Sequence, residues 1–226
     1  MAVKQTRSKA TTDIASPSSQ RVRAQRLSPE LRKEQLLQCA LQVFSEKGLG
    51  DGKHTDLAQV AAVAVPTTFH YFPTREDLIN ATLDEVARFL IEDIVIRNVD
   101  LNNPAPLVIK QILLCFADAI ETYPYHIRVW LEWSSSIRDG LWDRYLAFYK
   151  NAIRRIKAVL NAGKKDGSVH QQVDCDDAAR IIVGLAHMIT QMKFAGNSRA
   201  TIEHTIDSLV RGYLGAWDNR DPTAKP

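Results

Sequence analysis

The sequence predicts an all-α fold of about nine helices. Apolar residues recur at helical spacing in one segment after another, and glycine or proline separates most of these segments. No segment shows a sustained alternation of apolar and polar residues bounded by hairpin turns, so a β-sheet is not expected. A length of 226 residues suits one large domain or two modest ones.

The chain begins with a polar stretch and then a first helix. Residues 1–26 are rich in Ser, Thr, Gln, Lys and Arg and contain almost no large apolar residue. Such a segment buries too little surface to offset the entropy of ordering, so we expect a disordered basic arm. The helix that follows is predicted to start with Ser28 as its N-cap and Pro29 in its first turn, and to end at Gly48.

Two short helices joined by a tight turn are expected next. Thr55 is predicted to cap the first of them, which carries Leu57 on its apolar side. The second is predicted to run from Val65 to Phe72, where Pro73 prevents continuation. Two short helices with this connection form a helix-turn-helix, which places the start of its second helix in the major groove of DNA.

The rest of the chain keeps the helical pattern. Thr74 and Asp77 form a capping box that starts a long helix. Helices are expected over residues 75–97, 105–122, 125–137, 140–163, 175–195 and 199–218. The predicted organisation is a basic arm (1–26), a helix-turn-helix DNA-binding domain (27–73), a helical regulatory and dimerisation domain (74–218) and a flexible tail (219–226).

Composition limits the classes of function. No apolar run approaches the roughly 18–20 residues that span a bilayer, and no secretory signal is evident, so a cytoplasmic protein without a membrane partner is expected. The three cysteines are odd in number and form no CxxC pair, which indicates reduced thiols. HExxH, GxSxG, P-loop and metal-spaced Cys/His patterns are absent from the sequence, so we expect neither an enzyme nor a cofactor or metal.

Charge is distributed unevenly along the chain. Residues 1–75 carry 11 Lys or Arg against 6 Asp or Glu, whereas residues 76–226 carry 18 against 20. The N-terminal third therefore has the sign that meets a polyanion such as DNA, although many solvated faces have a similar balance.

The second short helix offers the first set of candidate DNA contacts. Its exposed end is predicted to present Pro66, Thr67, Thr68, His70 and Tyr71. Threonine hydroxyls reach phosphates or base edges, His70 can bond a purine edge, and the Tyr71 hydroxyl suits a phosphate. Phe69 and Phe72 are expected to pack inward against Phe44 and Leu57, with base stacking as the alternative.

Further candidate contacts lie at other helix starts and in the arm. Lys53, Thr55, Thr74 and Arg75 are placed to meet the DNA backbone, although each also fits a simple cap or a solvated charge. Arginines that directly precede the first helix suit a narrow minor groove, with a solubilising tail as the alternative. These arm residues are Arg21, Arg23 and Arg26.

These motifs resemble the TetR family of repressors. The resemblance rests on Leu57-Ala-x-x-Ala61, Val63, Thr67, Tyr71-Phe72 and Arg75-Glu-Asp-Leu78. Within the family, the chain resembles the vibrio quorum-sensing regulators of the LuxR/HapR type. The matching strings are Arg26-Leu-Ser-Pro29, His54-x-Asp56, Tyr71-Phe-Pro-Thr-Arg-Glu-Asp-Leu78 and Trp130-x-Glu-Trp-Ser-x-Ser-x-Arg-Asp-x-x-Trp142, and the similarity spans roughly residues 26–218.

The resemblance implies a homodimer on an operator of imperfect two-fold symmetry, with the arm arginines and residue 70 reading bases. Four positions depart from the pattern. Ala62 replaces the usual turn glycine, and Ala64 replaces the serine that caps the recognition helix. His70 stands where the subgroup has Asn, and Thr68 where it has Val, so operator preference is expected to differ.

The second half is expected to hold a ligand cavity and a dimer interface. Aromatic residues at helical spacing are usually core, yet this family commonly encloses an apolar cavity that suits a small ligand. Candidate lining residues are Leu90, Ile94, Phe116, Trp130, Trp133, Tyr149, Ala186 and Met188. Glu132 is expected to pair with Arg138 or to bond an indole.

The last two helices are expected to form a four-helix bundle with those of a second copy, although they could also pack only on their own subunit. Interface candidates are Ile182, Leu185, Ile189, Ile206, Leu209, Tyr213 and Trp217. Two alternatives to quorum-sensing control stay open. One is a ligand-responsive TetR repressor unrelated to quorum sensing, and the other is a ligand-sensing interaction module with weakened DNA binding.

Overall fold

The computed structural model describes residues 28–137 and 140–214, and the regular secondary structure within them is entirely helical. The α-helices in these residues are α1 Pro29–Lys47, α2 His54–Val60, α3 Val65–Tyr71, α4 Arg75–Arg88, α5 Ala105–Thr122, α6 Pro124–Ser135, α7 Trp142–Asp166, α8 Cys175–Phe194 and α9 Arg199–Leu214. The all-α class is therefore confirmed. The arm with Arg21, Arg23 and Arg26, the tail, and Arg138 and Trp217 lie outside the described residues.

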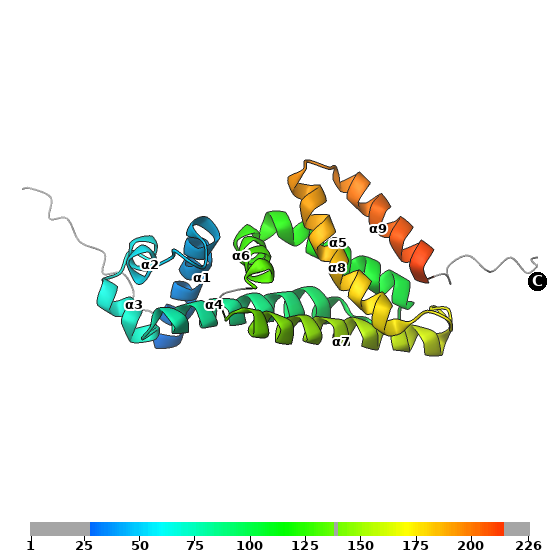
Figure 1. Cartoon of the computed structure of the whole chain (residues 1–226), viewed down its shortest axis with the longest axis horizontal. Coiled ribbons are helices and arrows are strands. Elements are labelled where there is room, and N and C mark those ends of the chain that lie inside the picture. Colours follow the sequence, from blue (N-terminus) through cyan, green and yellow to red (C-terminus); the bar gives the residue numbers. More distant parts are fainter. Residues whose placement is uncertain (1–27, 138–139, 215–226) are drawn as a thin grey trace, which may run out of the picture.

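The helices form an elongated molecule. The helices α1, α2 and α3 lie at one end, and α4 leads from them into a larger helical part (Figure 1). There α5 packs against α7, α8 and α9, and α7 packs along α8. The helix α6 contacts both α1 and α4, so it joins the larger part to the N-terminal unit.

Several helix boundaries follow the predicted capping residues. Ser28 Oγ accepts a hydrogen bond from the Leu31 N–H at 3.3 Å, and α1 ends where Gly48 adopts a φ of 87°. Thr74 Oγ1 accepts from the Asp77 N–H at 3.0 Å, and Asp77 Oδ2 accepts from the Thr74 N–H at 3.0 Å. The capping box at the start of α4 is therefore formed.

The start of α2 differs from the prediction. Lys53 is the N-cap and the helix begins at His54, so Thr55 lies inside the first turn and caps nothing. The reason is Asp56, whose Oδ2 accepts from the Lys53 N–H at 3.0 Å and fixes the start two residues earlier.

The long helix expected over residues 75–97 is also different. The α-helical part ends at Arg88, a π-helical segment η1 covers Phe89–Val95, and a short 3₁₀ segment η2 covers Ile96–Asn98. Leu90, Ile91, Ile94 and Val95 in η1 are all buried. The wider π turn thus directs two adjacent pairs of apolar residues into the interior, and π segments of this kind are frequent at functional sites.

One continuous apolar core runs through both parts of the molecule. Phe44, Leu57 and Phe72 are almost fully buried in the N-terminal unit, as expected for Phe72. Leu78 and Leu83 of α4 belong to the same core, so the helix-turn-helix rests on α4.

Candidate DNA-binding surface, ligand cavity and dimer face

A tight turn joins α2 to α3. Ala62 adopts a φ of 52°, the left-handed conformation that glycine accepts more readily than alanine. Ala64 is the N-cap of α3 and has no side chain that could bond the free N–H groups, whereas Pro66 occupies the first turn. The turn is closed by a hydrogen bond of 3.0 Å from the Val63 N–H to the Ala58 carbonyl.

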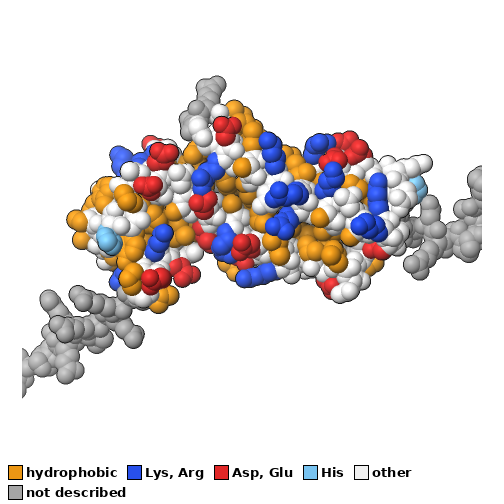
Figure 2. Space-filling model, turned by 90° about the horizontal axis from the view of Figure 1, so that it is seen from below, with side chains coloured by type: hydrophobic (Ala, Val, Ile, Leu, Met, Phe, Trp, Pro, Cys, Tyr) orange, Lys and Arg blue, Asp and Glu red, His pale blue; other side chains and the backbone are white. Residues whose placement is uncertain are grey.

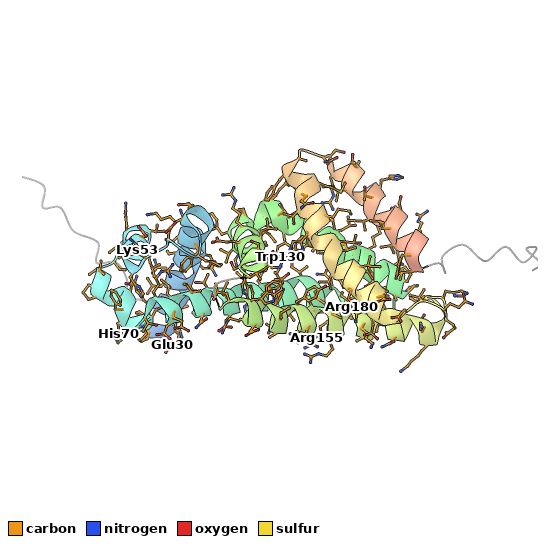
Figure 3. All side chains as sticks on the ribbon, viewed as in Figure 1. Glu30, Lys53, His70, Trp130, Arg155 and Arg180 are labelled. Carbon is orange, nitrogen blue, oxygen red and sulfur yellow. The ribbon has the colours of Figure 1, made fainter. Side chains whose placement is uncertain are left out.

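The exposed face of α3 differs in part from the predicted one. Pro66 and His70 are exposed, and Thr67 and Tyr71 are half-buried. Thr68 is fully buried, and its hydroxyl donates to the Val65 carbonyl at 2.8 Å, so it is not available to DNA. His70 lies at the same end of the molecule as Lys53 (Figure 3).

Phe69 overturns a second expectation. Instead of packing inward on Phe44 and Leu57, its side chain is 47% exposed. The ring stacks on His54, with centroids 4.0 Å apart and the planes within 2° of parallel. Phe72 alone takes the inward position, because it is the C-cap of α3 and leaves the helical conformation with a φ of −133° and a ψ of 88°, whereas Phe69 lies within the helix.

Of the other candidate DNA contacts around α3, some side chains are exposed and others are hydrogen-bonded within the chain. Lys53 and Thr55 are exposed at the start of α2. The Thr74 hydroxyl is engaged with Asp77 Oδ2 at 2.7 Å.

Most of the Arg75 guanidinium is hydrogen-bonded to backbone carbonyls of its own chain. Its Nε donates to the Gly52 carbonyl at 3.0 Å, and one terminal nitrogen donates to the Gly50 carbonyl at 2.5 Å and to the Leu49 carbonyl. Two of its three nitrogens therefore hold the 48–52 turn, which leaves the third for a phosphate, and the contact of Arg75 with the DNA backbone stays a prediction.

Charges beside α2 are partly neutralised. Lys47 Nζ lies 2.5 Å from Asp56 Oδ1, and this hydrogen bond holds the pKa of the Asp56 carboxyl below its usual range. The end of the molecule that carries α2 and α3 exposes apolar side chains among its charges (Figure 2).

An apolar cavity of about 70 Å³ lies among η1, α5, α6, α7 and α8. Six of the eight predicted lining residues face it: Leu90, Ile94, Phe116, Trp130, Tyr149 and Ala186. The prediction did not include Ile91 and Val95 of η1 or Tyr145 and Phe148 of α7, which also line it. The π segment brings the first pair inward, and no feature of the apolar spacing distinguishes it from an α-helix.

Trp133 and Met188 are not among the residues that line the cavity. Trp133 is held elsewhere because its indole N–H donates to the Leu141 carbonyl at 3.1 Å. Met188 is partly buried against the core instead. Both expectations are therefore corrected.

Polar groups at the cavity are few. Burial raises the pKa of the Tyr145 hydroxyl to about 12, and the Tyr145 and Tyr149 rings stack with centroids 6.1 Å apart. Behind Trp130 lies His187, with ring centroids 4.2 Å apart, and His187 Nε2 is 3.0 Å from Ser134 Oγ. Burial lowers the pKa of the His187 imidazole, which favours its neutral form.

A polar surface groove of about 420 Å³ adjoins the cavity between α4 and α7. Its charged lining residues are Asp84, Arg88, Glu92 and Arg144. Ile91 and Phe148 line both the groove and the cavity. These two side chains are therefore the partition between them.

The face formed by α8 and α9 differs in part from the predicted interface, since Leu209 and Tyr213 are exposed there as predicted. Ile182, Leu185, Ile189 and Ile206 are buried within their own chain. Exposed apolar residues on these helices include Ile181 at 42%, Leu209 at 36% and Tyr213 at 41%. They line a shallow groove between the two helices, because the buried residues are already used to pack α8 and α9 onto the core.

A helix-turn-helix unit on a larger helical part defines a class of DNA-binding transcriptional regulators. The chain matches the family model "Bacterial regulatory proteins, tetR family" over residues 36–82, from α1 into α4. It is 33% identical over 189 residues to the HTH-type transcriptional regulator LuxR of Vibrio harveyi, which covers 84% of this chain and 90% of the relative. The chain belongs to the TetR family of transcriptional regulators.

Two further matches are consistent with this assignment. The HTH-type transcriptional repressor KstR2 of Rhodococcus jostii is 24% identical over 189 residues, covering 81% of this chain and 87% of the relative. The solved structure of the fatty acid degradation regulator FadR from Bacillus halodurans superposes with a TM-score of 0.70 at 21% identity, covering 85% of this chain and 100% of that one. The likeness to this solved structure shows the fold alone.

The described residues contain neither a membrane-spanning helix nor a cluster of metal ligands. None of the helices in 28–137 and 140–214 is long and apolar enough to cross a membrane. Within the same ranges, no group of three or more His, Cys, Asp or Glu side chains could hold a metal ion.

Proposed function

We propose that this regulator binds, as a homodimer, a specific operator of imperfect two-fold symmetry. The observation that carries the proposal is the outward face of α3 at one end of the molecule, where Pro66, Phe69 and His70 are exposed. A recognition helix must offer base-reading side chains that its own domain does not bury, and α3 meets this requirement.

A dimer is required because one copy has a single recognition helix. Ile181, Leu209 and Tyr213 form an apolar face on α8 and α9, at the opposite end of the chain from α3. Pairing this face with its symmetry mate would make an isologous contact and present two copies of α3 to two half-sites. Apolar side chains in a continuous groove favour such a contact over exposure to water.

The similarity to the Vibrio harveyi regulator supports a finer proposal. We expect this chain to control gene expression in response to cell density, in the bacterial cytoplasm where the chromosome lies. A ligand-responsive repressor unrelated to quorum sensing is the second candidate, and the apolar cavity favours it.

The size of the cavity limits what it can hold. Pockets for drug-sized ligands are roughly 300–1,000 Å³, whereas this one is about 70 Å³. A ligand larger than a few heavy atoms must displace the partition of Ile91 and Phe148 or the Trp130 ring. Because η1 continues α4, such a displacement would act on the helix that supports the helix-turn-helix.

Selection from a pool of randomised DNA duplexes tests the main proposal. Full-length protein should enrich a sequence with two related half-sites, and the logarithm of its affinity should fall linearly with the logarithm of salt concentration. Enrichment of no sequence would leave the ligand-sensing module without DNA binding as the better description. Chromatin immunoprecipitation at low and high cell density then separates cell-density control from the second candidate.

A further inference from the structure

The outward face of α3 is more apolar than its sequence pattern suggests. Thr68 and Phe72 point inward and are fully or almost fully buried, whereas Pro66, Phe69 and His70 lie on the exposed side. At helical spacing, residues 66, 69 and 70 share one face of the helix. Two of these three side chains offer carbon atoms to whatever the helix meets.

The Phe69 ring is held in a fixed orientation. One face lies flat on the His54 imidazole at a centroid distance of 4.0 Å, and 47% of the side chain remains exposed. A ring ordered before binding loses less conformational entropy on binding than a mobile one. The exposed part of Phe69 is therefore preorganised for contact.

His54 fixes this orientation from inside the fold. It is 5% exposed at the start of α2, and its Nε2 lies 2.7 Å from the Phe72 carbonyl at the end of α3. The hydrogen bond anchors one edge of the imidazole, and the stack on Phe69 uses its face. A single buried side chain thus connects the start of α2 to both the end and the outward side of α3.

An apolar ring on a recognition helix matches one feature of the major groove. Each base pair presents hydrogen-bonding groups there, and thymine alone adds a methyl group, which Phe side chains contact. We propose that Phe69 determines specificity by contacting a thymine C5-methyl group, and that His54 is the positioning residue that holds its ring. This inference rests on the proposed function and names the base feature that α3 reads.

The test replaces thymine by uracil, which removes only the methyl group. The duplex selected by the wild-type protein is synthesised with each thymine changed to uracil in turn, and affinities are measured by fluorescence anisotropy at one salt concentration. At one thymine in each half-site, uracil should weaken wild-type binding about fourfold, the factor expected for one buried carbon group.

The Phe69→Ala variant should bind the thymine duplex about fourfold more weakly and give the same affinity with uracil at that position. Phe69→Leu, which keeps an apolar side chain, should retain a reduced preference for thymine and measures the effect if Phe69→Ala binds too weakly. Leu101→Ala is the matched control, because Leu101 is 63% exposed in the loop before α5, and it should keep the full preference.

Two variants separate the roles of His54. His54→Gln can still donate to the Phe72 carbonyl but lacks the ring. Its ratio of thymine to uracil affinity should therefore fall towards one, with little change in melting temperature. His54→Phe keeps a ring for the stack but loses the hydrogen bond, so the preference should remain while the melting temperature falls. Full thymine preference in a folded His54→Gln would overturn the positioning role.

The outcomes distinguish this inference from the proposed function. If the wild-type protein enriches no duplex, the proposed function fails. If it enriches one, and Phe69→Ala and Phe69→Leu keep the wild-type ratio of thymine to uracil affinity, the inference about Phe69 alone is wrong. It is also wrong if no thymine is sensitive to uracil and Phe69→Ala weakens every duplex equally.

Discussion

At the residue scale, the turn between α2 and α3 contains two alanines in positions that suit other residues. Ala62 holds a left-handed φ of 52°, and Ala64 caps α3 without a side-chain acceptor. A non-glycine residue in the left-handed region costs about 1–2 kcal/mol. Both departures are visible in the sequence, but only the structure shows that the left-handed conformation is kept in spite of them.

Replacing Ala62 by glycine should therefore stabilise the protein. The gain should be about 0.5–1 kcal/mol, since the relief of strain exceeds the added entropy of the unfolded chain. Urea denaturation measures it. Ala158→Gly is the matched control, because Ala158 is exposed inside α7 and glycine there should destabilise by about 1 kcal/mol. Equal effects of the two changes would contradict the role of φ.

Glu85 on α4 gives a pH dependence at the same scale. Both carboxylate oxygens accept from Arg88 at 2.8 Å, and His126 Nε2 of α6 lies 3.7 Å away. Burial raises the pKa of Glu85, but the hydrogen bonds from Arg88 and the proximity of His126 outweigh it and lower the pKa from 4.5 to about 2. The folded state therefore favours the charged carboxylate.

Because the pKa is depressed on folding, this stabilisation is complete above about pH 4.5 and is lost as pH falls towards 2. We expect the wild type to lose about 1–2 kcal/mol more than Glu85→Gln over that interval, after allowance for solvent screening. Urea denaturation at pH 5 and pH 2.5 measures the difference. Glu76→Gln, exposed on the same helix, should behave as the wild type does; the same loss in Glu85→Gln would contradict the assignment.

At the element scale, the turn between α1 and α2 is held from two sides. Arg75 at the start of α4 donates to three of its carbonyls. Glu132 of α6 accepts from the buried Leu49 N–H at 2.7 Å, which replaces the expected contact with an indole. Through the 48–52 turn, α4 and α6 are therefore hydrogen-bonded to the DNA-binding unit.

Glu132→Ala should leave the Leu49 N–H without its partner inside the fold. Such a loss costs about 1–3 kcal/mol, so the melting temperature should fall and operator affinity with it. Glu132→Gln keeps an acceptor oxygen and should lie close to the wild type in thermal denaturation. If alanine and glutamine have the same effect, the hydrogen bond does not carry the connection.

The elements themselves were largely predictable, and their orientation was not. Capping residues such as Ser28 and Thr74 fixed helix starts, because a cap depends on neighbours three residues away. Which of Phe69 and Phe72 points inward depends on how α3 packs on α2 and on Phe72 leaving the helical conformation, and no local pattern records either. The π turn of η1 was not predicted either, because its apolar residues also fit the spacing of an α-helix.

At the scale of the whole molecule, the proposed function gives the two ends of the chain separate tasks. The end with α3 is proposed to meet DNA, and α8 and α9, which lie away from it (Figure 1), are proposed to meet a second copy through their exposed apolar residues. Four predicted interface residues proved to be core, because a helix in this bundle must bury one side before it can offer another. The proposed interface is thus narrower than the sequence pattern indicated.

Leu209→Glu should separate the proposed dimer. A charge at the centre of a desolvated contact is costly, so we expect at least a tenfold rise in the dimer dissociation constant and a parallel loss of operator affinity. Analytical ultracentrifugation measures the first quantity. Leu101→Glu places the same charge on an exposed loop and should leave the dimer intact. A dimeric Leu209→Glu would refute the assigned face.

The cavity beside η1 also has a mechanical consequence. A volume of about 70 Å³ corresponds to roughly 40 mL per mole, and the decrease in volume on unfolding scales with the void that is eliminated without equalling it. Hydrostatic pressure should therefore open this part of the molecule first, and the fluorescence change that is lost when Trp130 of the cavity wall is replaced by phenylalanine reports it. Ala186→Leu, which fills the void, should raise the pressure at the midpoint of unfolding, because the small space makes this part of the regulator compressible.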